Sequence, residues 1–180
     1  SFRRVCFRQA GRLDWDTLSG QLQQHEQVLC VVNSRKSAQE IFTRLSGEGN
    51  FHLSTLMYPA HRRAKLEEIR RRLREGLPCR VISTSLIEAG VDVDFPAVFR
   101  EEAGLDSILQ AAGRCNREGK RPVSERIVSL FRGEAAPAPL FQTAIGAGRM
   151  VLEQYDDIAS REAIQAYFHT LLELKGAEAQ

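Results

Sequence analysis

The chain has 180 residues, which is enough for one well-buried domain with a small appendage and too short for two independent cores. Hydrophobic residues make up 43% of it and charged residues 27%, a balance that excludes a disordered or membrane protein. Its formal net charge of +2 is too small to indicate nucleic-acid binding by itself, so any such function must be argued from local residues.

Short apolar runs alternate with amphipathic segments along most of the chain, which is typical of a parallel sheet with crossover helices. We therefore predict an α/β fold. Six strands are expected, at residues 4–7, 28–32, 52–56, 80–84, 97–101 and 126–131.

Helices are predicted between several of these strands. Ser34 is a good N-cap at the point where the second strand should end, and apolar residues follow it at helical spacing. The next helix carries an apolar stripe of Leu66, Ile69 and Leu73 and ends at Gly76.

The same helix is rich in arginine, a residue that would suit nucleic acid. Glutamates are interleaved, however, and Glu67 and Glu68 stand four residues before Arg71 and Arg72. Because ion pairs along the helix account for several of these charges, we interpret the basic run as a solvated helix face.

The regular pattern stops after residue 131, where one glycine and two prolines among alanines are expected to interrupt it. Residues 158–174 then predict an amphipathic helix. We therefore divide the chain into a domain at residues 1–132 and a linker with a C-terminal helical extension at residues 133–180.

Neither secretion nor membrane insertion is expected. No apolar stretch is long enough to cross a membrane, and the arginines among the first residues are not followed by the apolar core of a secretory signal. No C-x-x-C pair occurs among the four cysteines, which indicates reduced thiols rather than a zinc site or a disulfide framework. We therefore expect a cytoplasmic protein without a metal site of its own.

The segment at residues 81–95 is the first that carries chemistry. It runs from a predicted buried strand into a loop, at the edge where open α/β sheets bind ligands. Ser83 and Thr84 have hydroxyls that can donate to a backbone phosphate, Gly90 allows close main-chain approach, and Asp92 can accept from a ribose hydroxyl. A turn capped by Ser or Thr, with Gly90 ending a helix, is an equally weighted alternative.

The second segment, at residues 110–119, follows a short predicted helix. Arg114 and Arg117 are three residues apart, so a helical turn places both guanidinium groups on one side, where they suit a triphosphate. A pair of arginines is more often a solvated surface, but the flanking Gln110 and Gly113 favour the functional interpretation.

These segments resemble motifs V and VI of superfamily 2 helicases, and Val32-Asn33-Ser34-Arg35 is similar to motif IV. Residues 88–95 combined with residues 110–117 resemble the CRISPR-associated type I helicase-nucleases in particular, as does the segment at 53–62. The similarity covers residues 28–121. It implies the second RecA-like domain of such a motor, a parallel sheet flanked by helices.

The resemblance implies that one group of residues faces a nucleotide held by the first RecA-like domain. Arg117 would be the arginine finger in catalysis and Arg114 its companion. The other implied nucleotide-binding positions are Gln110, Gly90, Asp92 and Gly113.

A second group would contact the phosphates of the tracking DNA strand without reading its sequence. The implied positions are Asn33, Ser34, Arg35, Ser83 and Thr84, with His61 and Arg62 in a loop that supports strand binding. Ser34 is equally well interpreted as a simple helix cap, and His61 as a partly buried histidine.

ATP hydrolysis needs groups that these 180 residues do not supply. The sequence contains no phosphate-binding loop of the form G-x-x-x-x-G-K-[ST], no acidic box for magnesium and no histidine-aspartate nuclease centre. The resemblance therefore implies that ATP and magnesium are held mainly by the first RecA-like domain of a longer polypeptide, and that this chain alone is inactive.

For the parent protein, the resemblance implies ATP-driven translocation on DNA and unwinding from 3′ to 5′. Its other partners would be single-stranded DNA and an RNA-guided surveillance complex of CRISPR type I interference, an antiviral defence in which the displaced strand is degraded. Two alternatives stay open: another superfamily 2 motor, such as an RNA helicase or a restriction translocase, and a non-catalytic nucleic-acid-binding module with a RecA-like shell.

Overall fold

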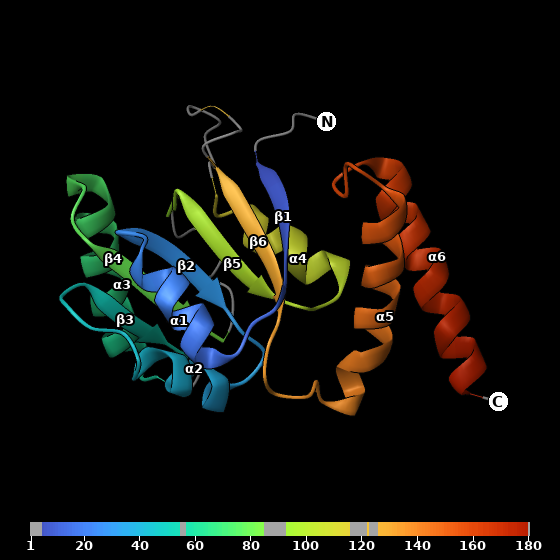
Figure 1. Cartoon of the computed structure of the whole chain (residues 1–180), viewed down its shortest axis with the longest axis horizontal. Coiled ribbons are helices and arrows are strands. Elements are labelled where there is room, and N and C mark those ends of the chain that lie inside the picture. Colours follow the sequence, from blue (N-terminus) through green and yellow to red (C-terminus); the bar gives the residue numbers. More distant parts are fainter. Residues whose placement is uncertain (1–4, 55–56, 85–92, 116–121, 123–125, 180) are drawn as a thin grey trace.

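The computed structural model describes residues 5–54, 57–84, 93–115, 122 and 126–179. Within these ranges, six strands form one sheet in the order β1-β6-β5-β2-β4-β3, and all paired neighbours are parallel (Figure 1). The strands are β1 (Cys6–Arg12), β2 (Gln27–Val31), β3 (Asn50–Leu53), β4 (Cys79–Ser83), β5 (Ala97–Glu101) and β6 (Ile127–Arg132). The predicted α/β fold with a parallel sheet is confirmed.

Strand boundaries are predicted best where the apolar run is continuous. Strand β5 matches its prediction, and β2, β4 and β6 are shifted by one residue. Strand β1 extends beyond its predicted end to Arg12, because it continues to pair with β6 although its outer residues are polar. Its register with β6 shifts between Gln9 and Gly11, where Gly11 has a φ of 72° and the strand bulges.

Helices cover both faces of the sheet. One face carries α1 (Trp15–Gln23) and α2 (Arg35–Phe42), and the other carries α3 (Pro59–Glu75), α4 (Leu105–Ala112), α5 (Pro139–Gln154) and α6 (Arg161–Glu178). Strand β2 shows the division: Val28 and Cys30 pack with α1 and α2, whereas Leu29 and Val31 belong to the core on the opposite side. Because both faces are covered, the central strands read as continuous apolar runs.

The predicted ends of two helices are confirmed by their hydrogen bonds. Ser34 has extended backbone, and its Oγ accepts from the Ser37 N–H at 3.1 Å, so it is the N-cap of α2. Gly76 ends α3 in the left-handed conformation, with a φ of 69°, and its N–H bonds back to the last turn of the helix.

Two helices were not predicted from the sequence. Helix α1 has an ordinary signature, with Asp14 accepting from the Thr17 N–H and with Leu18 and Leu22 buried on one face. The prediction that regular structure is interrupted holds for residues 133–138 and is wrong from Pro139 onward. Proline is compatible with the first turn of a helix, because the N–H it lacks would have no partner there, and Pro139 begins α5.

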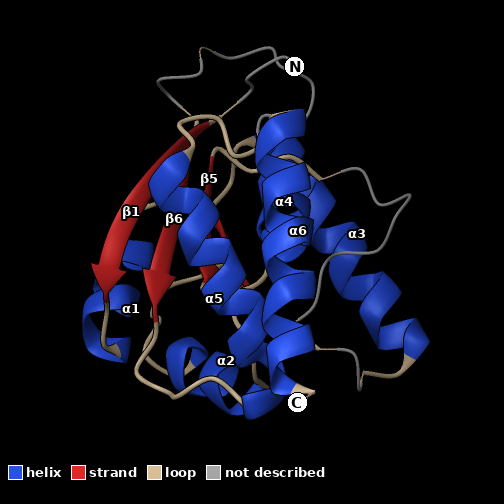
Figure 2. Ribbon diagram, turned by 90° about the vertical axis from the view of Figure 1, so that its right-hand side faces the viewer, coloured by secondary structure: helices blue, strands red, loops and turns tan. Residues whose placement is uncertain are grey.

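The C-terminal extension packs against the sheet. Helices α5 and α6 run alongside each other (Figure 2), and Thr143 of α5 donates to Glu178 of α6. Val151 and Tyr167 of these helices are buried in the same core cluster as Leu130 of the sheet. The division of the chain at residue 132 stays a prediction. Among the described residues, no helix is both long and apolar enough to cross a membrane.

The left-handed cap at Gly76 gives a prediction of stability. A Cβ at this position meets no atom within 4 Å, so Gly76→Ala adds backbone strain without a clash. We expect the free energy of unfolding to fall by about 1 kcal/mol and the Tm by about 2–4 °C. Thermal and urea denaturation followed by circular dichroism measure both.

The matched control is Gly20→Ala. Gly20 lies inside α1, also has open space around it, and has no positive φ. Since alanine favours the helical state, this substitution should raise the free energy of unfolding slightly. Effects of the same sign in both variants would contradict the assignment of strain to Gly76.

Candidate functional site

Residues of the two expected strand-binding segments meet at one edge of the sheet. Asn33 and Ser34 follow β2, and Thr84 follows β4, the parallel neighbour of β2. Val31 is level with Ser83, and the Val32 N–H donates to the Ser83 carbonyl at 2.9 Å. The carboxyl ends of these strands therefore bring the two segments side by side, as expected for a ligand-binding edge of an α/β sheet.

These residues differ in how accessible they are. Ser34 and Arg35 are exposed at the start of α2, and Thr84 is half-buried. Ser83 is only 1% exposed, so a phosphate can reach its hydroxyl only after the edge rearranges. The exposed set and the N-terminus of α2 present positive charge at this edge.

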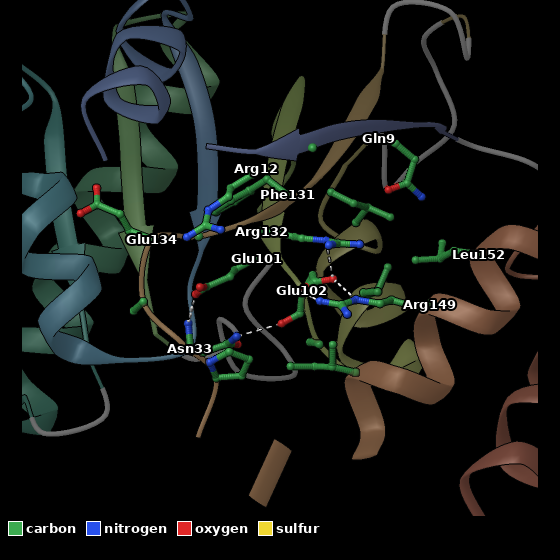
Figure 3. A pocket seen from close by; sticks show the side chains of 18 of the residues that line it. Gln9, Arg12, Asn33, Glu101, Glu102, Phe131, Arg132, Glu134, Arg149 and Leu152 are labelled. Atoms are coloured by element: carbon green, nitrogen blue, oxygen red, sulfur yellow. Dashed lines mark hydrogen bonds and ion pairs between the residues drawn. The ribbon is translucent and has the colours of Figure 1, made fainter. Parts of the chain in front are cut away.

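Asn33 is fully engaged within the protein. Its backbone N–H donates to Glu101 Oε1 at 2.9 Å, and its Nδ2 donates to the Glu102 carbonyl at 2.8 Å (Figure 3). Its Oδ1 accepts from Arg100 Nη1 at 3.0 Å. With both amide atoms used, the Asn33 side chain holds the loop from which Ser34 and Arg35 project.

Arg100 and Glu101 are site residues that the motif analysis missed. Both lie at the end of β5 and are buried, 7% and 5% exposed. Burial raises the pKa of Glu101, opposed by the Asn33 N–H and by Arg100, and burial lowers the pKa of Arg100. Two adjacent charged residues inside an apolar strand were the available signal, because buried charges need partners.

A cleft opens beside this cluster, between the carboxyl ends of β1, β5 and β6 and helix α5. It has a volume of about 740 Å³. Glu102 lies on its wall, where it accepts hydrogen bonds from Arg149 Nε at 2.5 Å and Nη2 at 2.8 Å and forms an ion pair with Arg132, whose Nε is 3.2 Å away (Figure 3). The cleft therefore joins the candidate strand-binding edge to the C-terminal extension.

His61 and Arg62 were expected in a loop, which is wrong: both lie in the first turn of α3, after the loop that follows β3, and they differ in accessibility. His61 is exposed and lies edge-to-face with Tyr58, their ring centroids 6.2 Å apart, so the alternative of a partly buried histidine is wrong. Arg62 is 9% exposed, and its Nη1 donates to the Ser54 carbonyl at 2.8 Å. This geometry favours a role for Arg62 in holding the loop.

The candidates in the motif VI segment lie at the opposite edge. Helix α4 starts near the carboxyl end of β5 and runs back along the sheet, leaving Gln110 and Gly113 exposed near its end. The Arg114 carbonyl accepts from the Phe95 N–H at 2.8 Å, before the start of β5. At about 3.3 Å per residue, the five residues of β5 separate Arg114 from the strand-binding edge by roughly 15 Å.

Three further candidates, Gly90, Asp92 and Arg117, lie outside the described residues. Gly90 and Asp92 belong to the connection from β4 to β5, which leaves the carboxyl edge at Thr84 and returns to the amino edge at Val93. The described stretch that precedes Arg117 ends at Cys115, whose backbone is bridged to Phe95.

Comparison with known proteins identifies the family of the chain. Residues 24–120 match the family model described as CRISPR-associated nuclease/helicase Cas3, C-terminal. A CRISPR-associated nuclease/helicase Cas3 from Methanothermobacter thermautotrophicus is 28% identical over 134 residues, 72% of this chain and 16% of that protein.

Solved structures give the same fold. The crystal structure of T. fusca Cas3-ATP superposes with a TM-score of 0.70 at 16% identity, covering 97% of this chain and 25% of that one. A chain of a CRISPR RNA-guided surveillance complex, pre-nicking, has a TM-score of 0.64 at 16% identity, covering 98% of this chain and 28% of that one. The chain thus spans about a quarter of each of these structures and 16% of the relative from Methanothermobacter thermautotrophicus. Its predicted RecA-like fold is confirmed. It belongs to the family of the C-terminal part of the CRISPR-associated nuclease/helicase Cas3.

Proposed function

We propose that this chain is the second RecA-like half of an ATP-dependent DNA helicase or translocase of CRISPR type I interference, and that it is inactive without the first half. The observation that carries the proposal is the separation of two polar groups on one rigid sheet. Ser34, Arg35 and Thr84 lie at the carboxyl edge, whereas Gln110 and Arg114 lie near the end of α4. A motor half needs both groups, one that binds the DNA strand and one that contacts the nucleotide.

On the nucleotide side, the chain supplies charge rather than a binding pocket. ATP bound to the first half supplies the phosphoryl group that is transferred to water. Arg117, with Arg114 as its companion, neutralises charge that develops on that group, and Gln110, Gly113, Gly90 and Asp92 line the same contact. Magnesium would be held by the first half together with ATP.

On the strand side, the contacts position DNA without reading its sequence. The exposed Arg35 and the N-terminus of α2 attract a phosphate, and the hydroxyls of Ser34 and Thr84 add donors. Closure of the two halves around ATP and their reopening after hydrolysis would move this edge along the strand, from 3′ to 5′. In the parent, the displaced strand of a target bound by an RNA-guided surveillance complex is the substrate for degradation.

The purified chain should have no ATPase activity of its own, because ATP is bound by the first half. Phosphate release should stay at background with or without single-stranded DNA, while the full-length parent turns ATP over under the same conditions. Turnover by the chain that disappears in an Arg114→Ala variant would contradict the proposal, because that activity would arise from its own site.

The strand contact at Arg35 predicts a change in salt dependence. In the full-length parent, Arg35→Ala should weaken single-stranded DNA binding and reduce the slope of log K against log salt by about 0.7, the value for one phosphate contact. Fluorescence anisotropy at several salt concentrations measures this slope.

Arg74→Ala is the matched control for Arg35→Ala. It removes the same charge from an exposed arginine, but Arg74 lies in the last turn of α3, which starts near the carboxyl edge and ends away from it. Equal slopes for Arg35→Ala and Arg74→Ala would show that only net charge matters, and would remove Arg35 from the strand contact.

The role of Arg117 predicts a loss of rate. In the full-length parent, Arg117→Ala should lower kcat for DNA-stimulated ATP hydrolysis at least about a hundredfold, because an arginine finger acts mainly in the transition state. Arg117→Lys should fail as well, since lysine keeps the charge but loses the planar fork. Steady-state kinetics with thermal melts measure activity and folding together.

Arg71→Ala serves as the control for the loss of an arginine. Arg71 pairs with Glu68 at 2.6 Å and Glu75 at 2.8 Å on the surface of α3, and its removal should leave turnover near wild type. Near-normal turnover in a folded Arg117→Ala protein would overturn the assignment of the finger.

A further inference from the structure

Glu102 connects three elements at the carboxyl edge. It follows β5 directly, and its side chain is 18% exposed. Its carboxylate forms ion pairs with Arg149 of α5 and Arg132 of β6 (Figure 3). Its backbone N–H donates to the Phe131 carbonyl at 2.8 Å, and its own carbonyl accepts from Asn33 Nδ2. One residue therefore binds the C-terminal extension through its side chain and, through its backbone, the loop at residues 32–35, the motif IV loop.

The Arg149–Glu102 pair differs from an ordinary surface ion pair. Exposed pairs contribute little, but two parallel bonds from one guanidinium to a largely buried carboxylate fix direction as well as distance. Both Nε and Nη2 of Arg149 donate to Glu102, and this bonding raises the pKa of Arg149. Arg132 completes a network on the same carboxylate.

Helices α5 and α6 also pack closely on the residues after Glu102. A Cβ added to Gly148, the neighbour of Arg149, would stand 3.0 Å from the Ala103 carbonyl oxygen. A Cβ added to Gly104 would stand 2.5 Å from the Tyr167 hydroxyl of α6 and 3.3 Å from Ala144 of α5. The backbone after β5 is thus held by the extension without space for a side chain.

The same two residues hold Asn33. Glu101 accepts the Asn33 N–H with its side-chain carboxylate and Glu102 accepts the Asn33 side-chain amide with its carbonyl, so a shift of residues 101–102 shifts the motif IV loop with it. From Arg149 to Asn33 the path contains a single residue, Glu102. A displacement of α5 relative to the sheet can therefore reach the strand-binding edge through Glu102.

We propose that Glu102 and Arg149 are positioning residues through which the seating of α5 sets the geometry of the motif IV loop, and hence the grip of Ser34 and Arg35 on the DNA strand. This inference rests on the proposed function for its consequence, but the coupling itself is a property of the fold. A parent protein that moves its C-terminal extension would loosen or tighten the strand contact by this route.

Hydrogen exchange measured by mass spectrometry tests the coupling in the full-length parent without reference to activity. Arg149→Ala and Glu102→Gln should each speed exchange of the amides at residues 31–37 by at least about threefold, because their local opening becomes easier. If the pair only fixes α5 to the sheet, its loss should speed amide exchange in α5 alone. Unchanged exchange at residues 31–37 in both variants would overturn the proposal.

Arg71→Ala is the matched control in this experiment. The Arg71 side chain is 41% exposed, against 43% for Arg149, and it forms ion pairs with Glu68 and Glu75. It lies on α3, away from the cleft. It should leave exchange at residues 31–37 at the wild-type rate. If Arg149→Ala melts globally, Arg149→Lys and Glu102→Gln carry the test, because each alters the pair with little change in packing.

DNA-stimulated ATPase kinetics test the functional consequence. The variants at 102 and 149 should raise the DNA concentration needed for half-maximal stimulation at least about threefold and leave kcat at saturating DNA near wild type, because they alter ground-state strand binding. Arg149→Lys should lie between Arg149→Ala and wild type. A parent without DNA-stimulated ATPase would contradict the proposed function, whereas stimulation that is normal in every variant would contradict the role of Glu102 in strand grip.

Discussion

The parallel pairing of β2 with both β4 and β5 is the constraint on which the candidate strand-binding edge depends. Val31 is level with Ser83 on one side and with Arg100 on the other, so the residues that follow these three strands emerge at the same height. A shift of one residue in either ladder would exchange the side chains that face the two cores, so that Leu29 and Val31 would lie where Val28 and Cys30 now pack with α1 and α2. The apolar cores on both faces therefore fix the relative positions of Asn33, Thr84 and Glu101.

Burying Arg100 and Glu101 at the end of β5 carries a desolvation cost that their partners offset in part, since burial still lowers the pKa of Arg100 and raises that of Glu101. Arg100 Nη1 donates to the Val31 carbonyl and to Asn33, and Glu101 accepts the Asn33 N–H. These bonds contribute direction more than stability, because they fix how the loop leaves β2. The exposed Arg35 can then carry the contact with a phosphate, since its neighbour Asn33 is already held within the protein.

Much of the fold could be predicted from the sequence because its signals are local. Continuous apolar runs located β2, β4, β5 and β6, and the cap residues Ser34 and Gly76 marked helix ends that the structure confirms. Helix α5 was missed because Pro139 looks the same whether it breaks a helix or begins one. Long-range partners decided the rest: the extension of β1 depends on β6.

The candidate site was predicted in residue type and order, but not in placement. That Arg114 lies at the edge opposite Thr84 depends on the path of α4 across the sheet, which motif spacing does not encode. The burial of Arg62 and the internal bonding of Asn33 also come from tertiary contacts. The roles of Gly90, Asp92 and Arg117 stay predictions.

The bulge in β1 bears on the tendency of the protein to self-associate through its sheet. In the described sheet, β1 and the four-residue β3 are the two outer strands. An outer strand that is flat and apolar offers unpaired backbone groups on which another chain can template, and so promotes self-association. Such a template is interrupted in β1 by the bulge at Gly11 and by the exposed side chains of Arg8 and Arg12. The outer edge of β1 can therefore face solvent without pairing with a strand of another chain.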